Sequence, residues 1–410
     1  MPLNTDKMAA LSVYYKQHLL ADVLPFWENR TKDPEGFGYL TQFDRAGRLI
    51  GTEKNMWVQG RQLWMFSAIY NYAARRSSLL ELADWGRRFI KQHGYAGEGK
   101  WHYILDRAGG VIRGPVSIFA DMFVLSGLCE YAIAAGSDED EELIEATFAG
   151  IESRFMSGNL SEVAPQTWNP SLQKHGVYMI CLNMIANVRK RIGEERVAPL
   201  RALCLNKILL TFLKKDRMLL FESVDLAGNP SDSDEGRLIN PGHTFESMWF
   251  CLEEALRTDD KETADLTVRM IDRMYERSWD SEHGGIYYML DAAGQTPKYR
   301  DWVQGRNFKW DEKVSWTHNE ALYAVLLAAF ATGEEKRFSC FLEIHDWCLA
   351  HFRDVQYGEW YDALHRNGEP RLTDKGGYQK AAFHLPRALL KIYLLLEHGL
   401  AKGKGWHQSI

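Results

Sequence analysis

Residues 218–256 read MLLFESVDLAGNPSDSDEGRLINPGHTFESMWFCLEEAL and combine two kinds of local signal. The first part is a short apolar segment that ends in a turn at Gly228, which is typical of a strand in a hairpin. Asn-Pro-Gly at 240–242 interrupts any preceding element, and the apolar run from His243 onward predicts a helix. His243 and Glu246 lie one turn apart on that helix and should share a face, with Glu246 as the carboxylate neighbour of the imidazole.

The same hairpin signature recurs along the chain. It appears as GFGYLTQFDRAG, GKWHYILDRAG, MLLFESVDLAG, GGIYYMLDAAG and GEWYDALHRNG, which end at Gly47, Gly109, Gly228, Gly294 and Gly368. The interval between the second and third copies is about twice the others, which predicts a further degenerate copy near Leu160 to Pro170. The chain therefore contains six units.

Each copy is followed by an apolar helix, and most copies by a second, amphipathic one. The apolar helices are expected at residues 57–73, 116–134, 176–188, 243–256, 316–330 and 382–400, and amphipathic helices at 78–94, 140–155, 261–278 and 335–352. Helices that are apolar all round must be covered on both sides, whereas amphipathic helices show one face to water. Six buried helices alternating with six exposed ones predict an all-α fold, an (α/α)6 barrel with short β-hairpins on its rim, as a single domain over residues 1–410.

Net charge, cysteine pattern and apolar segments indicate which partners and which cell compartment to expect. The formal net charge of -6 gives no electrostatic reason to expect nucleic acid or an anionic membrane as a partner. The six cysteines form no CxxC pair and are expected as small buried side chains in a reducing compartment. The N-terminus lacks a continuous apolar segment and no stretch of 18 uncharged residues occurs, so we expect a cytoplasmic protein without a membrane span.

Polar and aromatic residues gather in the first turns of the predicted inner helices, which converge on one end of the barrel axis. They are Trp57, Arg61, Ser117, Asp121, Asn183, His243, Glu246, Trp316, Glu320, His384 and Arg387. Two histidines, carboxylates and two arginines in an aromatic-walled funnel exceed what packing requires, which indicates a catalytic pocket. For His175, just before the third inner helix, a rim position and a place in the funnel are both open, whereas His318 should face away from Glu320.

Two imidazoles suit the removal of a proton beside a carbonyl and its return on the other side of the carbon. An imidazole titrates close to neutral pH and therefore serves as base in one direction and as acid in the other. Arg61 would stabilise the enediolate oxygen that develops. A glycosidase using a carboxylate pair from Glu246, Glu320 and Asp121 stays open. We expect no metal, because HExxH is absent and His243 and His384 lack an obvious third ligand.

Several motifs resemble those of the N-acylglucosamine 2-epimerase family, also called renin-binding protein. They are KNMWVQGRQLWMFSAIY, GRLINPGHTFESMWF, WDSEHGGIYYMLDAAG, KVSWTHNEALYA, FRDVQYGEWYDALHRNG and KGGYQKAAFHLPRALL. The similarity runs in order from about Phe26 to Leu396. It implies an (α/α)6 barrel, epimerisation at C2 of a ring-opened sugar without a required cofactor, a homodimer, and ATP as a candidate allosteric activator.

The resemblance also assigns residues. It implies that His243 and His384 are the essential histidines, supported by Arg61 in WVQGR, Glu246 in GHxxE and Glu320 in NEALYA. Predicted substrate-binding residues are Trp57, Arg237 in the GRLxNPGH pattern, Trp316 and Arg387.

The chain departs from the family pattern in the expected pocket wall. Ser315 and Thr317 replace the first Trp and the Pro of WWPH, whereas Ile180 at the place of a histidine of the cellobiose epimerases favours the N-acylglucosamine branch. We therefore expect interconversion of N-acetylglucosamine and N-acetylmannosamine. A free-hexose epimerase or isomerase, and a non-catalytic sugar-responsive binding protein, remain the alternatives. The insert at 300–312 repeats WVQGR and is either a lid contact or a surface loop.

Overall fold

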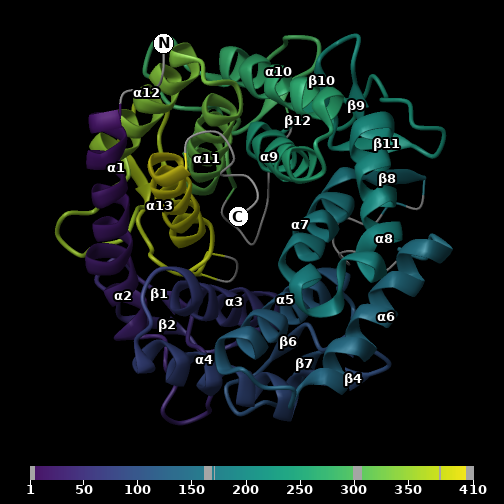
Figure 1. Cartoon of the computed structure of the whole chain (residues 1–410), viewed down its shortest axis with the longest axis vertical. Helices are drawn as coiled ribbons and strands as arrows, with labels where there is room; N and C mark the ends of the chain where they lie inside the picture. Colours follow the sequence, from purple (N-terminus) through teal and green to yellow (C-terminus); the bar gives the residue numbers. More distant parts are fainter. Residues whose placement is uncertain (1–4, 161–168, 170, 299–306, 378–379, 403–410) are drawn as a thin grey trace.

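The computed structural model describes residues 5–160, 169, 171–298, 307–377 and 380–402, and in this part of the chain the helices form two concentric rings (Figure 1). The inner ring consists of α3 (Met56–Tyr72), α5 (Ile118–Ala135), α7 (His175–Ile192), α9 (Pro241–Thr258), α11 (Ser315–Thr332) and α13 (His384–Lys402). The outer ring consists of α1 (Thr5–Gln17), α4 (Ser77–Phe89), α6 (Glu141–Ser157), α8 (Glu194–Asn206), α10 (Lys261–Ser278) and α12 (Glu335–His351). The predicted (α/α)6 barrel is confirmed. Short helical pieces extend three outer helices, namely η1 (His18–Val23) with α2 (Leu24–Glu28), η2 (Ile90–Gly94) and η3 (Lys207–Phe212).

The ring closes through the two ends of the chain. The last inner helix, α13, packs against the first inner helix, α3, and α1 packs against α13 from outside. Figure 1 shows the purple α1 beside the yellow α13. The outer helix of the sixth unit is therefore supplied by the N-terminal segment, and the first and last parts of the chain complete one unit together.

Burial explains the division into inner and outer helices. Among the described residues, α5 is the one helix long and apolar enough to cross a membrane by length and composition, and 83% of it is buried inside the protein. It is a core helix of the barrel, covered on both sides. The outer helix α10 instead buries Leu266, Met270, Ile271 and Met274, which lie on one face at helical spacing, and shows its charged face to water.

Short antiparallel strands form small sheets in the connections between outer and inner helices. The pairs are β1 (Gln42–Phe43) with β2 (Leu49–Gly51), β4 (Tyr95–Gly97) with β5 (Lys100–Trp101), β8 (Leu172–Lys174) with β11 (Ser223–Asp225), β9 (Leu213–Lys214) with β10 (Leu219–Leu220), and β12 (Leu238–Ile239) with β13 (Leu290–Asp291). The three-stranded sheets are β3 (Lys54–Asn55), β6 (Ile104–Leu105) and β7 (Val111–Arg113), and β14 (Lys313–Val314), β15 (Ala363–Leu364) and β16 (Pro370–Leu372). The strand that precedes an inner helix repeatedly pairs with the hairpin of the next unit, so each pair fixes where an inner helix begins. The predicted degenerate hairpin near residues 160–170 lies mainly on 161–168 and 170, outside the described residues.

Three of these connections share a charge cluster in which an aspartate and a lysine are buried and an arginine is partly exposed. An aspartate follows an outer helix, a lysine precedes the next inner helix along the barrel, and an arginine comes from the hairpin before the inner helix after that. The clusters are Asp33, Lys54 and Arg107, then Asp280, Lys313 and Arg366, and finally Asp354, Lys375 and Arg45. In the last cluster Arg45 Nε lies 2.8 Å from Asp354 Oδ2, so an ion pair links the first and sixth units where the ring closes.

Candidate active site

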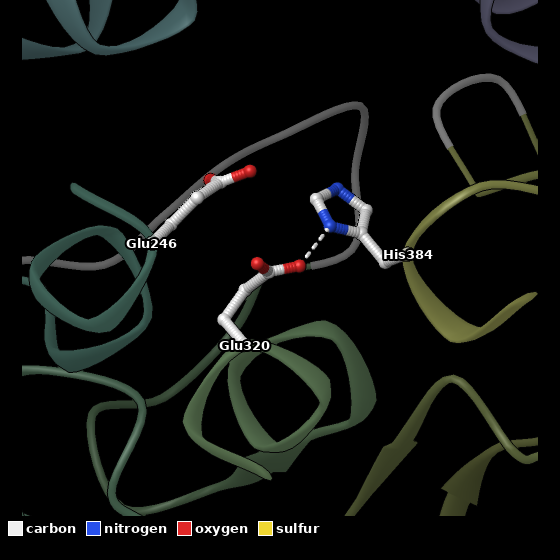
Figure 2. Close-up of side chains that lie close together, drawn as sticks. All are labelled: Glu246, Glu320 and His384. Atoms are coloured by element: carbon white, nitrogen blue, oxygen red, sulfur yellow. Dashed lines mark hydrogen bonds and ion pairs between the residues drawn. The ribbon is translucent and has the colours of Figure 1, made fainter. Parts of the chain in front are cut away.

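His384, at the start of α13, and Glu320, in the second turn of α11, form a hydrogen-bonded pair (Figure 2). Nδ1 of His384 lies 2.7 Å from Oε1 of Glu320. Because a carboxylate only accepts hydrogen bonds, we assign the imidazole proton to Nδ1, which leaves Nε2 as the basic nitrogen. Glu320 also accepts hydrogen bonds from Nη2 of Arg387 at 2.7 Å and from Nε1 of Trp249 at 2.8 Å. Glu320 thus fixes both the position and the tautomer of His384.

Arg387 joins this pair to a second carboxylate. Its Nη2 donates to Oε1 of Glu246 at 2.6 Å and lies 3.4 Å from Nδ1 of His384. Burial, together with the positive charges of Arg61 and Arg387, holds the pKa of His384 well below its usual range. His384 is therefore neutral at neutral pH, which is the form required of a general base.

His243 is held by a different carboxylate. It is the third residue of α9, whose first turn is capped by Asn240, and the Asn240 Oδ1 accepts from the His243 backbone N–H at 3.1 Å. Nδ1 of His243 lies 2.8 Å from Oε2 of Glu222, in the connection between β10 and β11. The expected neighbour, Glu246, points to Arg387 instead, so the predicted pairing of His243 with Glu246 is wrong. Sequence reasoning missed Glu222 because it belongs to the preceding hairpin.

The pair formed by His243 and Glu222 favours opposite charges on its two members. Burial opposes ionisation of Glu222, but the charge of His243 and the hydrogen bond to it keep the pKa of Glu222 below its usual range. Glu222 is therefore a carboxylate at neutral pH, and a carboxylate at this distance stabilises an imidazolium. The surroundings of the two histidines therefore differ, because His384 has two guanidinium groups near it in addition to its carboxylate partner Glu320, whereas His243 bonds the carboxylate of Glu222.

Trp316 forms a wall shared by both histidines. The centroid of its ring lies 5.2 Å from that of His243 and 5.6 Å from that of His384. Gly242 makes this approach feasible, because a Cβ at that position would lie 2.5 Å from Cζ3 of the Trp316 ring. The glycine of the NPGH motif is therefore required by the position of Trp316.

Arg61 is enclosed by aromatic rings. Its guanidinium carbon lies 4.9 Å from the ring centroid of Trp57, 4.2 Å from that of Phe123 and 4.4 Å from that of Phe383. Among the described residues it forms no ion pair, and its buried Nε has no hydrogen-bond partner. Burial lowers the pKa of Arg61 to about 9, against the opposing effect of the Glu246 carboxylate. A cation held in this way is suited to receive an oxygen that becomes negatively charged.

Two further residues considered in the sequence are engaged elsewhere. Arg237 binds Asp291 at 3.0 Å and Asp234 at 2.7 Å, so its guanidinium is already paired in the turn before α9. His318 is fully buried on α11, and its Nε2 accepts a hydrogen bond from the backbone N–H of Ile286 at 2.8 Å. Its structural role agrees with the prediction that it stays outside the proton-transfer chain.

Glu246, Glu320 and His384 form a compact group of metal-ligand type (Figure 2). One ligand atom from each residue lies within 4.8 Å of the others. The guanidinium of Arg387 donates to both carboxylates, so Arg387 supplies the positive charge at this point. A cation that bound these three side chains would have to compete with Arg387.

The insert lies partly beside the aromatic wall. Residues 299–306, which include the repeated WVQGR motif, lie outside the described residues. Phe308, at the described end of the insert, is buried and its ring centroid lies 5.1 Å from that of Tyr288. Tyr288 in turn makes an edge contact with Trp316 at 6.3 Å. The end of the insert therefore backs the wall that both histidines contact.

The fold and this site define a helical-barrel enzyme suited to proton transfer between two carboxylate-held histidines. A sequence model of the N-acylglucosamine 2-epimerase (GlcNAc 2-epimerase) family matches residues 38–388. The N-acylglucosamine 2-epimerase of Mus musculus is 30% identical over 392 residues, which cover 90% of this chain and 87% of that protein. The cellobiose 2-epimerase of Dictyoglomus turgidum is 24% identical over 400 residues, which cover 92% of this chain and 96% of that protein.

Solved structures agree on the fold. The cellobiose 2-epimerase from Spirochaeta thermophila matches with a TM-score of 0.82 at 19% identity, covering 96% of this chain and 98% of that one. The chain belongs to the N-acylglucosamine 2-epimerase family, and it is accordingly a carbohydrate epimerase, an isomerase.

Proposed function

We propose that this protein interconverts N-acetylglucosamine and N-acetylmannosamine by removing the proton at C2 and returning a proton to the opposite face. The observation that carries this proposal is the pair of histidines, His243 and His384, each held by its own carboxylate and both in contact with Trp316. The relatives named N-acylglucosamine 2-epimerase, at about 30% identity over most of the chain, support the choice of substrate.

The reaction begins with the open-chain sugar, in which C2 lies beside the C1 carbonyl. Neutral His384 takes the C2 proton at Nε2, and the electron pair of the C–H bond moves into an enolate, in which C1 and C2 share a double bond and the negative charge lies on O1. Arg61, which has no carboxylate partner among the described residues, stabilises that oxygen. His243, as the imidazolium favoured by Glu222, returns a proton to C2 on the other face. In the reverse reaction the two histidines exchange roles.

Two alternatives differ in substrate or in turnover. A free-hexose epimerase or isomerase is favoured by Ser315 and Thr317 beside Trp316, and by more distant relatives named cellobiose 2-epimerase and D-mannose isomerase, at 24% and 22% identity. A sugar-binding protein without turnover would have no need of two histidines that are each held by a carboxylate. The first alternative keeps the proton transfer at C2 but acts on a different sugar. The second binds a sugar without converting it.

Proton NMR in D2O separates these functions. The purified protein is incubated in separate tubes with N-acetylglucosamine, N-acetylmannosamine, glucose and mannose. The proposal expects the C2 epimer of an N-acetylated sugar, with deuterium at C2, to appear fastest. Faster conversion of a free hexose would move the assignment to the first alternative, and saturable binding without exchange in any tube would favour the binding protein.

The proposal also includes a cytoplasmic homodimer that needs no cofactor and responds to ATP as an activator. The six cysteines are free, which supports a reducing compartment. Light scattering of the purified protein tests the dimer, and rates measured across an ATP titration test activation.

A further inference from the structure

A second buried histidine lies behind the pair formed by His243 and Glu222. His175 is the first residue of α7 and has no exposed surface. Its backbone N–H donates to the carbonyl of Glu222 at 3.0 Å, which continues the pairing of β8 with β11, where Lys174 lies opposite Ser223. The ring centroid of His175 is 6.4 Å from that of His243. The backbone therefore fixes His175 and Glu222 as neighbours.

Two buried polar atoms face each other across this contact. Nδ1 of His175 and Oε1 of Glu222 both lack a hydrogen-bond partner, and they lie 3.9 Å apart. Buried polar atoms without partners are rare in native proteins because they lose their bonds to water. A shift of about 1 Å in the Glu222 carboxylate brings the two atoms to hydrogen-bond distance. The other oxygen, Oε2, remains bonded to His243.

The opposite side of the His175 ring sets its tautomer. Nε2 lies 2.8 Å from Oγ of Ser247, which is one turn beyond His243 on α9. Burial lowers the pKa of His175 to about 4, so the ring is neutral and carries one N–H. When the Ser247 hydroxyl donates to Nε2, the single ring proton of His175 must sit on Nδ1, where it faces Glu222. The other tautomer would place a lone pair against the carboxylate, which is unfavourable.

We infer that His175 is a positioning residue that holds Glu222 in the orientation required by His243. The inference rests on the two-histidine epimerisation proposed above and deepens it. His384 has separate support from Glu320 and Arg387, so loss of His175 should impair the half of the reaction that uses His243 and spare the half that uses His384.

The test compares conversion with exchange in D2O. The epimer that His384 deprotonates is first identified as the one whose C2 proton still exchanges in His243→Asn. In His175→Phe, conversion of that epimer should slow about tenfold or more, the effect typical of losing a hydrogen-bond partner behind a functional histidine. Exchange at C2 of the recovered substrate should persist, so the ratio of exchange to conversion rises by a similar factor. Equal slowing of both processes, or no change in the ratio, would overturn the inference.

Two variants keep the test decisive if His175→Phe folds poorly. In His175→Asn the side-chain amide nitrogen occupies the place of Nδ1 and keeps a donor toward Glu222, so the ratio should return toward the wild-type value. Ser247→Ala removes the hydroxyl that sets the tautomer, and the ratio should rise about fivefold, the equivalent of one neutral hydrogen bond. The inference is contradicted if His175→Asn shows the same ratio of exchange to conversion as His175→Phe. It is also contradicted if Ser247→Ala shows the wild-type ratio.

His345→Phe is the matched control for the substitution itself. His345 is a buried histidine on α12 that bonds Tyr15 of α1, and this change should leave the ratio unaltered. A control that raises the ratio as much as His175→Phe would show a general packing effect. Wild-type protein that neither converts nor exchanges either sugar would refute the proposed function, whereas conversion with an unchanged ratio in His175→Phe would refute the role of His175 alone.

Discussion

Gly242→Ala should impair catalysis more than folding, because it pushes on the wall that both histidines share. A Cβ at position 242 would lie 2.5 Å from Cζ3 and 2.6 Å from Cη2 of Trp316, and 2.9 Å from Oγ1 of Thr317. The first two atoms are the outer edge of an indole ring. The ring is therefore the group that moves, and it moves relative to His243 and His384.

The magnitude follows from these contacts. Carbon atoms pack at about 3.5–4.0 Å, so the ring must retreat by about 1 Å. A displacement of this size in an active site costs about 100-fold in rate. Overpacking of a core costs about 1–3 kcal/mol. With an unfolding entropy of about 2.1 cal/mol/K per residue over the 410 residues, this cost lowers Tm by about 1–4 °C.

The assay measures kcat/KM for both N-acetylated epimers together with thermal unfolding. Gly176→Ala is the matched control, because Gly176 is also the second residue of an inner helix and a Cβ there meets nothing within 4 Å. Alanine is favoured over glycine in a helix, so the control should be active and at least as stable as the wild type. A folded Gly242→Ala with wild-type kcat/KM would refute the argument that Trp316 forms the wall of the site.

Two further predictions concern charge. Arg387→Gln removes a positive charge 3.4 Å from Nδ1 of His384, which raises the pKa of that imidazole, so the acidic limb of kcat/KM should move to higher pH; an unmoved limb would contradict this. Asp354→Asn leaves buried Lys375 without its carboxylate and should destabilise the protein by about 3 kcal/mol in denaturant unfolding, whereas Asp44→Asn, at an exposed ion pair, should have little effect. Because the ion pairs lower the pKa of Asp354 in the folded state, their stabilisation is present above about pH 4 and lost as pH falls further, so the difference from wild type should narrow in acid. Equal unfolding midpoints at pH 7 would contradict the role of this cluster.

The repeat pattern was sufficient to predict the barrel. The alternation of fully apolar and amphipathic helices depends on which helix faces are buried, and the spacing of apolar residues in the sequence indicates those faces. The same reasoning placed His384 and Arg387 one turn apart at the start of an inner helix, where they lie 3.4 Å apart. The outer helix of the sixth unit was harder to assign, because α1 comes first in the sequence but packs against the last inner helix, α13.

The partners of the site residues depended on contacts between units. Glu222 directly precedes β11, and the pairing of β11 with β8 fixes the position from which the Glu222 side chain reaches His243 on α9. Strands of three residues carry too little alternation to reveal their register in the sequence. Arg237 shows the same limit, since its partner Asp291 belongs to the following hairpin. The place of each site residue along its helix was therefore predictable, whereas its partner often was not: His243 and Glu246 share α9, yet each bonds a residue of another segment.

The most direct test of the two-histidine mechanism is C2 exchange in D2O by His243→Asn and His384→Asn, each supplied with each epimer separately. The mechanism predicts that both variants lose interconversion, by a factor of about 100 or more, as expected for removal of a general acid or base. Each variant should still exchange the C2 proton of one epimer, and the two variants should exchange opposite epimers. Near-full interconversion in either variant, or exchange of the same epimer by both, would contradict the assignment of one histidine to each face of the sugar.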